Sequence, residues 1–218
     1  MSNVTRAARA RTRGGFVSGS FPGWATLGLV AVLGLVLPTA FVAIAEGAGA
    51  IALPFNLFVV DERLPVVFRL HMLASGAALA LLPLVIALRH RPRWHKPLAR
   101  LAAVAIVAGA LSSFPVALAS DSVLAARLGF LAQGVVWLGL LAAGVAAIRA
   151  RDRSRHARLM LAMAAVSSGA IWVRLTTAVV VAQRLPFEVI YGCVAWLGWL
   201  VPLAIVWRLG ARRRPAVA

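Results

Sequence analysis

Six apolar stretches, each long enough to cross a lipid bilayer, constrain this chain more than any other feature. They cover approximately residues 24–46, 65–88, 97–118, 126–148, 158–182 and 188–207. About 20 apolar residues span a bilayer as a helix, and backbone groups in lipid must form hydrogen bonds within their own segment. The chain is 62% hydrophobic and 13% charged, against about 25% charged in soluble domains. The sequence therefore predicts an all-α, polytopic transmembrane bundle of six helices over residues 24–208.

The placement of charge predicts the orientation. The net charge is +17, and most of the basic residues lie before the first helix, in 89–96, in 149–158 and from 208 onward. These regions alternate with loops that hold five of the six acidic residues. The positive-inside rule then makes 1–23 and 209–218 basic cytoplasmic tails of a cell inner membrane protein. The same alternation favours contact of the cytoplasmic loops with anionic lipid headgroups and argues against nucleic-acid binding.

Two further expectations concern the first helix and the loop that follows it. Its apolar run exceeds the roughly 7–15 residues of a signal peptide, so an uncleaved first helix is predicted. The following outer loop contains an apolar stretch, Ile51 to Val60, that is too short to span. It predicts an interfacial or re-entrant segment in which Pro54 and Asn56 interrupt any regular helix.

Helices 2–3 and 4–5 have the features of a duplicated helical hairpin. The pattern R-L-x-x-L-A-x-G occurs at 69–76 and again at 127–134, and the basic segments 87–93 and 147–153 also match. A histidine follows each basic segment, His95 and His156. Matches at both ends of the hairpin favour a true repeat. On helix 3, a stripe of small residues at 105, 109 and 113 predicts close approach of another helix.

Ionisable groups inside membrane spans are costly and are candidates for function. In the outer half these are Arg69, His71, Arg127, Arg174 and Glu188, and Gln133 lies at similar depth. If they face the bundle axis, they form an outward-facing polar pocket. In the alternative interpretation, Arg69, Arg127 and Glu188 extend to the interface. Arg174 then forms a structural bridge to Glu188, Gln133 or a backbone carbonyl.

The two repeated histidines, His95 and His156, carry a second hypothesis. Two histidines that face each other across a bundle can ligate a six-coordinate haem b. The simpler interpretation places both at the membrane interface beside basic loops. Neither a phosphate-binding loop nor a catalytic motif such as HExxH or GxSxG occurs in the sequence, so no catalytic residue is predicted.

Several motifs resemble those of a family of bacterial polytopic membrane proteins, a domain of unknown function. They are His71-Met72, the segment 95–100 that begins His-Lys-Pro-Leu, and the segment 156–160 followed by Arg174. Lys96 and Ala157 depart from the arginine that commonly follows each loop histidine in that family. The resemblance covers about 65–208 and implies a membrane fold of about six helices without an assigned reaction.

A looser resemblance is to membrane cytochromes b that carry two haems. Here the pattern departs, because the repeat partner of His71 is Gly129, so at most one inner haem is compatible with it. The sequence therefore predicts an integral membrane protein with an outward polar pocket, as a small transporter or membrane subunit. The alternative is a single-haem electron-transfer protein.

Overall fold

The computed structural model describes residues 23–212, and the helices in that range account for nearly all of them. The predicted tails lie largely in 1–22 and 213–218, outside the described residues. The elements in order are α1 (Gly23–Ala31), a π-helical turn η1 (Val32–Val36), α2 (Leu37–Gly47), α3 (Phe55–Arg63), α4 (Pro65–Ala87), α5 (Pro92–Ala119), α6 (Leu124–Arg149), α7 (Arg153–Ser167), α8 (Gly169–Ala182) and α9 (Phe187–Arg212).

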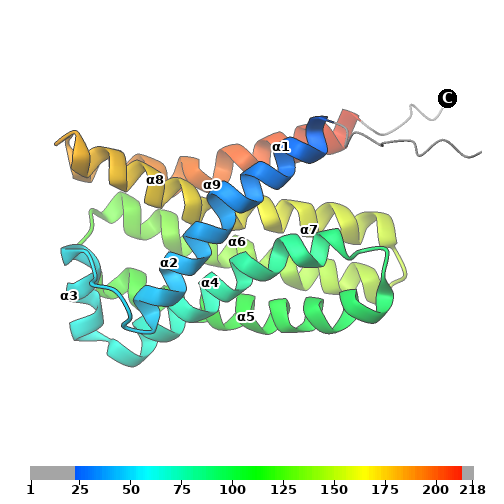
Figure 1. Ribbon diagram of the computed structural model, residues 1–218, viewed down its shortest axis with the longest axis horizontal. Helices are drawn as coiled ribbons and strands as arrows, with labels where there is room; N and C mark the ends of the chain where they lie inside the picture. Colours follow the sequence, from blue (N-terminus) through cyan, green and yellow to red (C-terminus); the bar gives the residue numbers. More distant parts are fainter. Residues whose placement is uncertain (1–22, 213–218) are drawn as a thin grey trace, which may run out of the picture.

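Six helical spans are long and apolar enough to cross a membrane, as the sequence predicted. They are Thr26–Gly47, Pro65–Ala87, Pro92–Ala119, Leu124–Arg149, Arg153–Ala182 and Phe187–Leu209. Large apolar side chains cover their outer faces, for example Leu27, Val104 and Val189. Apolar surface on this scale is far larger than soluble monomers expose. The spans lie along the long axis of the molecule, and α1–α2 crosses the others obliquely (Figure 1).

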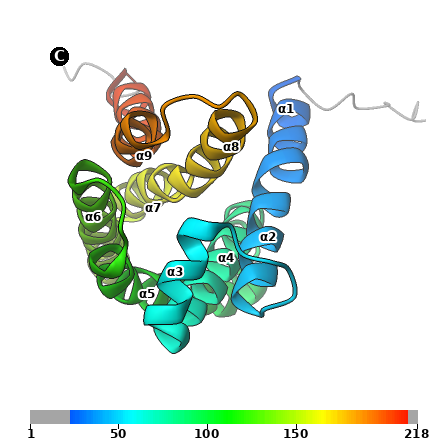
Figure 2. The same cartoon turned by 90° about the vertical axis from the view of Figure 1, so that its left-hand side faces the viewer.

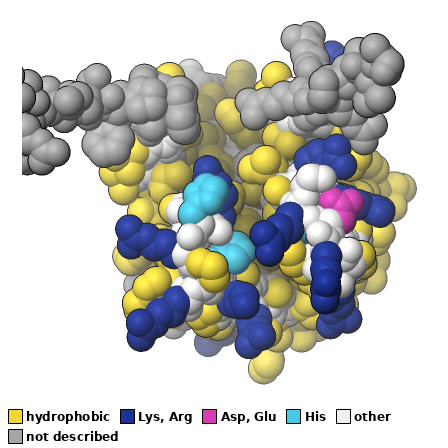
Figure 3. Space-filling view, turned by 90° about the vertical axis from the view of Figure 1, so that its right-hand side faces the viewer, with side chains coloured by type: hydrophobic (Ala, Val, Ile, Leu, Met, Phe, Trp, Pro, Cys, Tyr) yellow, Lys and Arg dark blue, Asp and Glu magenta, His cyan; other side chains and the backbone are white. Residues whose placement is uncertain are grey.

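The two ends of the bundle differ in charge. At one end, called here the acidic end, lie α3 and the turns after α5 and α8, with Asp61, Asp121 and Glu188. At the other, the basic end, lie the α4–α5 and α6–α7 turns (Figure 1). Arginine and lysine side chains surround the basic end (Figure 3). The basic and acidic segments that alternate along the sequence therefore lie at opposite ends of the bundle.

Two spans are irregular. The π-helical turn ends at Val36, two residues before Pro38, which lacks the N–H needed for regular pairing. The fifth span, expected as one helix over 158–182, divides at Ser168 into α7 and α8. The hydroxyls of Ser167 and Ser168 donate to the carbonyls of Met163 and Ala165 in their own helix. Such back-bonding by serine bends helices.

The apolar stretch after α2 forms a short helix on the acidic end. Pro54 precedes α3 as its N-cap residue, but Asn56 lies inside the helix rather than interrupting it, so that part of the expectation was wrong. Two bidentate ion pairs attach α3 to the bundle. Asp61 accepts from Arg69 of α4 at 3.1 Å, and Arg63 donates to Asp121 of the α5–α6 loop at 2.6 and 2.8 Å.

Helix α4 lies between α2 and α5 and packs extensively against both (Figure 2). Gly76 lies against α2, where a Cβ would come 3.0 Å from the Ala40 carbonyl oxygen. Gly109 lies against α4, where a Cβ would come 2.7 Å from Ser75 Oγ. The small-residue stripe on α5 thus permits the close helix contact that the sequence predicted.

The two predicted hairpins, α4–α5 and α6–α7–α8, have several equivalent contacts, each formed within its own hairpin. At the basic end, His95 Nδ1 lies 3.0 Å from the Val85 carbonyl oxygen, and His156 Nδ1 lies 2.9 Å from that of Gly144. In the middle, Gly169 lies against Gln133 as Gly109 lies against Ser75. Each of these residues in the second hairpin lies 58–61 positions after its counterpart in the first hairpin. These equivalent contacts support a duplicated hairpin.

Candidate functional site

A partly buried ion pair lies in the acidic half of the bundle. Arg174 of α8 donates from Nη2 to Glu46 Oε2 at 3.1 Å, and the side chains are 29% and 7% exposed. Arg174 is eight residues from the end of α8, so its Cα lies about 12 Å inside that helix end. Glu46 is one residue from the end of α2. The arginine side chain therefore extends toward the acidic end and meets a carboxylate there.

His71 lies beside this ion pair with a defined tautomer. Its Nδ1 is 2.9 Å from the carbonyl oxygen of Gly109, and a carbonyl can only accept, so Nδ1 carries the hydrogen. Ser75 Oγ lies 3.5 Å from the same nitrogen. The opposite ring nitrogen, Nε2, is therefore left with its lone pair in the neutral ring. Met72, the next residue along α4, contacts Arg174, which brings His71 and the ion pair into one polar cluster.

Two more side chains complete this cluster. Met72 Sδ lies 4.0 Å from Arg174 Nη2. Thr177, one turn along α8, has a buried hydroxyl without a hydrogen-bond partner among the described residues. An arginine, a carboxylate, an imidazole and a free hydroxyl thus lie together inside the acidic half of the bundle.

A cavity of about 140 Å³ opens at the acidic end. Its walls come from α3, the α5–α6 loop and the start of α9, and Tyr191 lines it together with Asn56, Asp121 and Glu188. Tyr191 also stacks on Phe187, with ring centroids 4.9 Å apart. This cavity, called here the vestibule, lies in the same half of the bundle as the Arg174–Glu46 ion pair.

The structure separates three of the residues that the sequence grouped with His71 and Arg174. Arg69 is bound to Asp61 at the α3 contact. Gln133 donates from Nε2 to the carbonyl of Val166 at 2.9 Å, at the break between α7 and α8. Glu188 is exposed in the vestibule wall. The expected bridge from Arg174 to Glu188 or Gln133 is replaced by one to Glu46.

Glu46 is the site residue that the sequence reasoning missed. The sequence places it at the outer end of the first span, where it was counted only among the acidic charges of the outer side. Its position inside the span was the available signal, since carboxylates within spans require a partner. Arg174 was the one deep arginine still lacking a partner.

The two inner histidines lie at the basic end, each within its own hairpin. Val85 is near the end of α4, where carbonyls lack an intrahelical donor, so the ring of His95 satisfies one of them. His156 makes the equivalent bond to Gly144. Both rings therefore carry hydrogen on Nδ1 and direct Nε2 elsewhere. Each histidine stabilises a hairpin, and each keeps one nitrogen free for another role.

These features define a polytopic helical membrane protein with a polar cluster inside its acidic half. Residues 68–209 match the family described as "Predicted membrane protein (DUF2306)", a domain of unknown function, and the chain belongs to that family. The match covers α4 to α9, the same range that the sequence motifs indicated. No curated protein and no solved structure matches the chain.

Proposed function

We propose that this protein binds a small anionic solute at the Arg174 cluster, as a small transporter or as the solute-binding subunit of a membrane complex. The supporting observation is that the Arg174 guanidinium uses few of its hydrogen-bond donors within the protein. Arginine has five N–H donors in a planar fork. Among the described residues, only Nη2 of Arg174 donates, while 29% of the side chain is exposed. A carboxylate or phosphate group can use the remaining donors in a bidentate manner.

The neighbouring groups suit such a ligand. Glu46 holds the guanidinium in place and prevents an anion from being bound too tightly to leave. His71 Nε2 and the hydroxyl of Thr177 offer further polar contacts inside an otherwise apolar site. Ligand sites in proteins usually combine apolar walls with a few convergent polar groups of this kind.

Binding is tested on the full chain in detergent with a panel of acetate, lactate, succinate, glutamate and inorganic phosphate. At least one of these anions is expected to raise the melting temperature of the wild type and of Arg184→Leu, an exposed arginine in the turn after α8. Arg174→Lys is expected to weaken the shift, because lysine lacks the planar fork. No shift with any anion, or equal shifts in Arg174→Lys, would reject the proposal.

Access and orientation are proposed together: the vestibule faces the outside of the cell inner membrane, and both termini are cytoplasmic. The alternation of basic and acidic loops supports this orientation. In a Cys193→Ala background, Tyr191→Cys is expected to react with a membrane-impermeant thiol reagent in whole cells, whereas Leu197→Cys on the apolar face of α9 is not. Labelling of Tyr191→Cys only in inverted vesicles would reverse the orientation.

A single haem b between His95 and His156 is the alternative. One specific observation favours it. Histidines that ligate metals commonly donate their other ring N–H to a backbone carbonyl, and both histidines do so from Nδ1. Absorbance of the purified protein tests this: a Soret band that His95→Ala and His156→Ala both remove supports haem. A preparation without that band from haem-replete cells rejects it.

A further inference from the structure

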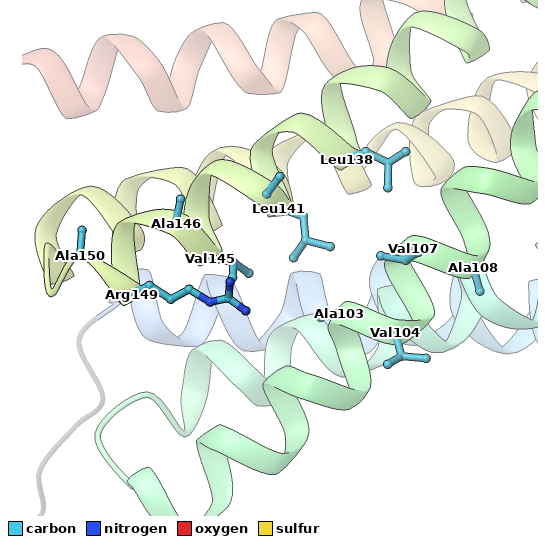
Figure 4. A pocket seen from close by; sticks show the side chains of 11 residues that line it. Ala103, Val104, Val107, Ala108, Leu138, Leu141, Val145, Ala146, Arg149 and Ala150 are labelled. Carbon is cyan, nitrogen blue, oxygen red and sulfur yellow. The ribbon is translucent and has the colours of Figure 1, made fainter.

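An apolar groove runs along the outside of the bundle between α5 and α6. Its volume is about 1110 Å³, and its walls are leucine, valine and alanine side chains (Figure 4). Alanines at 142, 146 and 150 leave the α6 wall hollow. The two helices are in close contact nearer the acidic end, where a Cβ on Gly134 would come 2.9 Å from Ser113 Oγ. Toward the basic end they diverge, and the groove opens between the two hairpins.

One charged residue lines this groove. Arg149, at the end of α6, lies with its guanidinium over the space between the helices (Figure 4). Among the described residues it forms no ion pair. Its counterpart in the first hairpin, Arg89, instead donates to the Ile86 carbonyl oxygen at 3.2 Å. Arg100 lies four residues before Val104 and so on the same side of α5 as the groove wall.

The length of the groove matches one leaflet of a membrane. Its α6 wall runs from Leu138 to Ala150, which is about 18 Å at 1.5 Å per residue. Half of a hydrocarbon core of about 30 Å is about 15 Å. An acyl chain that lies in the groove from the middle of the bilayer would place its headgroup at the level of Arg149.

We infer that the α5–α6 groove is a binding site for one anionic phospholipid of the leaflet at the basic end. The acyl chain occupies the hollow lined by small residues, and the headgroup phosphate binds Arg149, with Arg100 nearby. Charge complementarity decides between occupants. An apolar helix of a second copy would bury the Arg149 guanidinium without an anion, which is costly in lipid, whereas a phosphate pairs with it. This site is independent of the Arg174 cluster at the other end.

Native mass spectrometry of the full chain in detergent tests the inference. The probes are phosphatidylglycerol and phosphatidylcholine with the same palmitoyl and oleoyl chains. The wild type is expected to retain one phosphatidylglycerol at least tenfold more tightly than phosphatidylcholine. Arg149→Gln is expected to lose that preference, and Arg89→Gln, the matched arginine outside the groove, is expected to keep it.

Two variants test the groove itself. Ala146→Leu and Ala142→Leu fill the hollow and are expected to reduce retention of both lipids, with melting temperatures close to that of the wild type. The inference is overturned by equal retention of the two lipids, by equal loss in Arg89→Gln and Arg149→Gln, or by full retention in both leucine variants. A stable dimer that either leucine variant disrupts would also overturn it, because a second copy would then occupy the groove.

Discussion

The guanidinium of Arg174 and the carboxylate of Glu46 lie 3.1 Å apart although 128 positions separate them in the chain. This contact joins α2 to α8, two elements that otherwise touch little. The first span lies outside the matched family region, so one half of the central ion pair comes from the helix that precedes residues 68–209.

Removal of both partners of this ion pair is expected to cost less stability than the sum of the two single removals. Glu46→Gln and Arg174→Met each leave a charge without its partner in a largely buried site, and such changes cost about 3–5 kcal/mol in soluble proteins. The double variant should lose less than the sum of the two. Melting temperatures of the four proteins in detergent form the double-mutant cycle, and strictly additive losses would contradict a direct interaction.

Gly109 is expected to tolerate no side chain. In Gly109→Ala the new Cβ would come 2.7 Å from Ser75 Oγ and 3.2 Å from the Ser75 backbone nitrogen. Overpacking of this kind costs about 1–3 kcal/mol. The control is Gly139→Ala on α6, where nothing lies within 4 Å of the new Cβ. That change should be neutral or should stabilise the helix by up to about 1 kcal/mol. Equal thermal stability of the two variants would disprove the close α4–α5 contact.

Attachment of α3 to the α5–α6 loop is expected to weaken in acid. The hydrogen bond from Arg63 holds the pKa of Asp121 below its ordinary value near 3.8. A carboxyl with a depressed pKa stabilises the folded form above its ordinary pKa, and this contribution is lost as the pH falls through the lower folded value. A spin label on Phe58→Cys in a Cys193→Ala background should therefore stay immobile at pH 5 and gain mobility below pH 3.8.

The control for this acid transition is Asp121→Asn. Its label should be more mobile at pH 7 and less sensitive to acid, because the ion pair is already absent. An identical pH response in Asp121→Asn and its parent would assign the transition to other groups.

Gln133 is expected to stabilise the break in the fifth span. Gln133→Leu removes the donor to the Val166 carbonyl and leaves that oxygen without its side-chain partner in a partly buried site, at a cost of about 1–3 kcal/mol. The matched control is Gln183→Leu, an exposed glutamine that follows α8. Melting temperatures should separate the two variants. A silent Gln133→Leu would show that the two serines alone support the bend.

The lengths of the apolar runs, the placement of charged residues and the repeated motif were sufficient to predict the six spans, the charge separation and the hairpin repeat. These features depend on residue type at regular spacing, and lipid allows few alternatives. The site was harder to predict. His71 and Arg174 are expensive in a membrane and were found for that reason, but Glu46 was counted only among the acidic charges of the outer side. Its contact depends on the oblique course of α1–α2 across the bundle, which no local pattern specifies.

The break at Ser168 shows a second limit of sequence reasoning. Serine is compatible with a continuous membrane helix, and residues 158–182 contain no proline. What distinguishes this segment is the set of groups beside it. Gln133 binds the Val166 carbonyl, and Trp137 Nε1 donates to Ser167 Oγ at 2.8 Å. Tertiary contacts of this kind decide the local geometry only once the helices have assembled.

The three partly buried histidines share one arrangement: His71, His95 and His156 each donate from Nδ1 to a carbonyl of a neighbouring helix. Each ring therefore ties two neighbouring helices together through Nδ1 and turns Nε2 away from that contact. Replacement of any one of the three removes a link between helices rather than an isolated side chain.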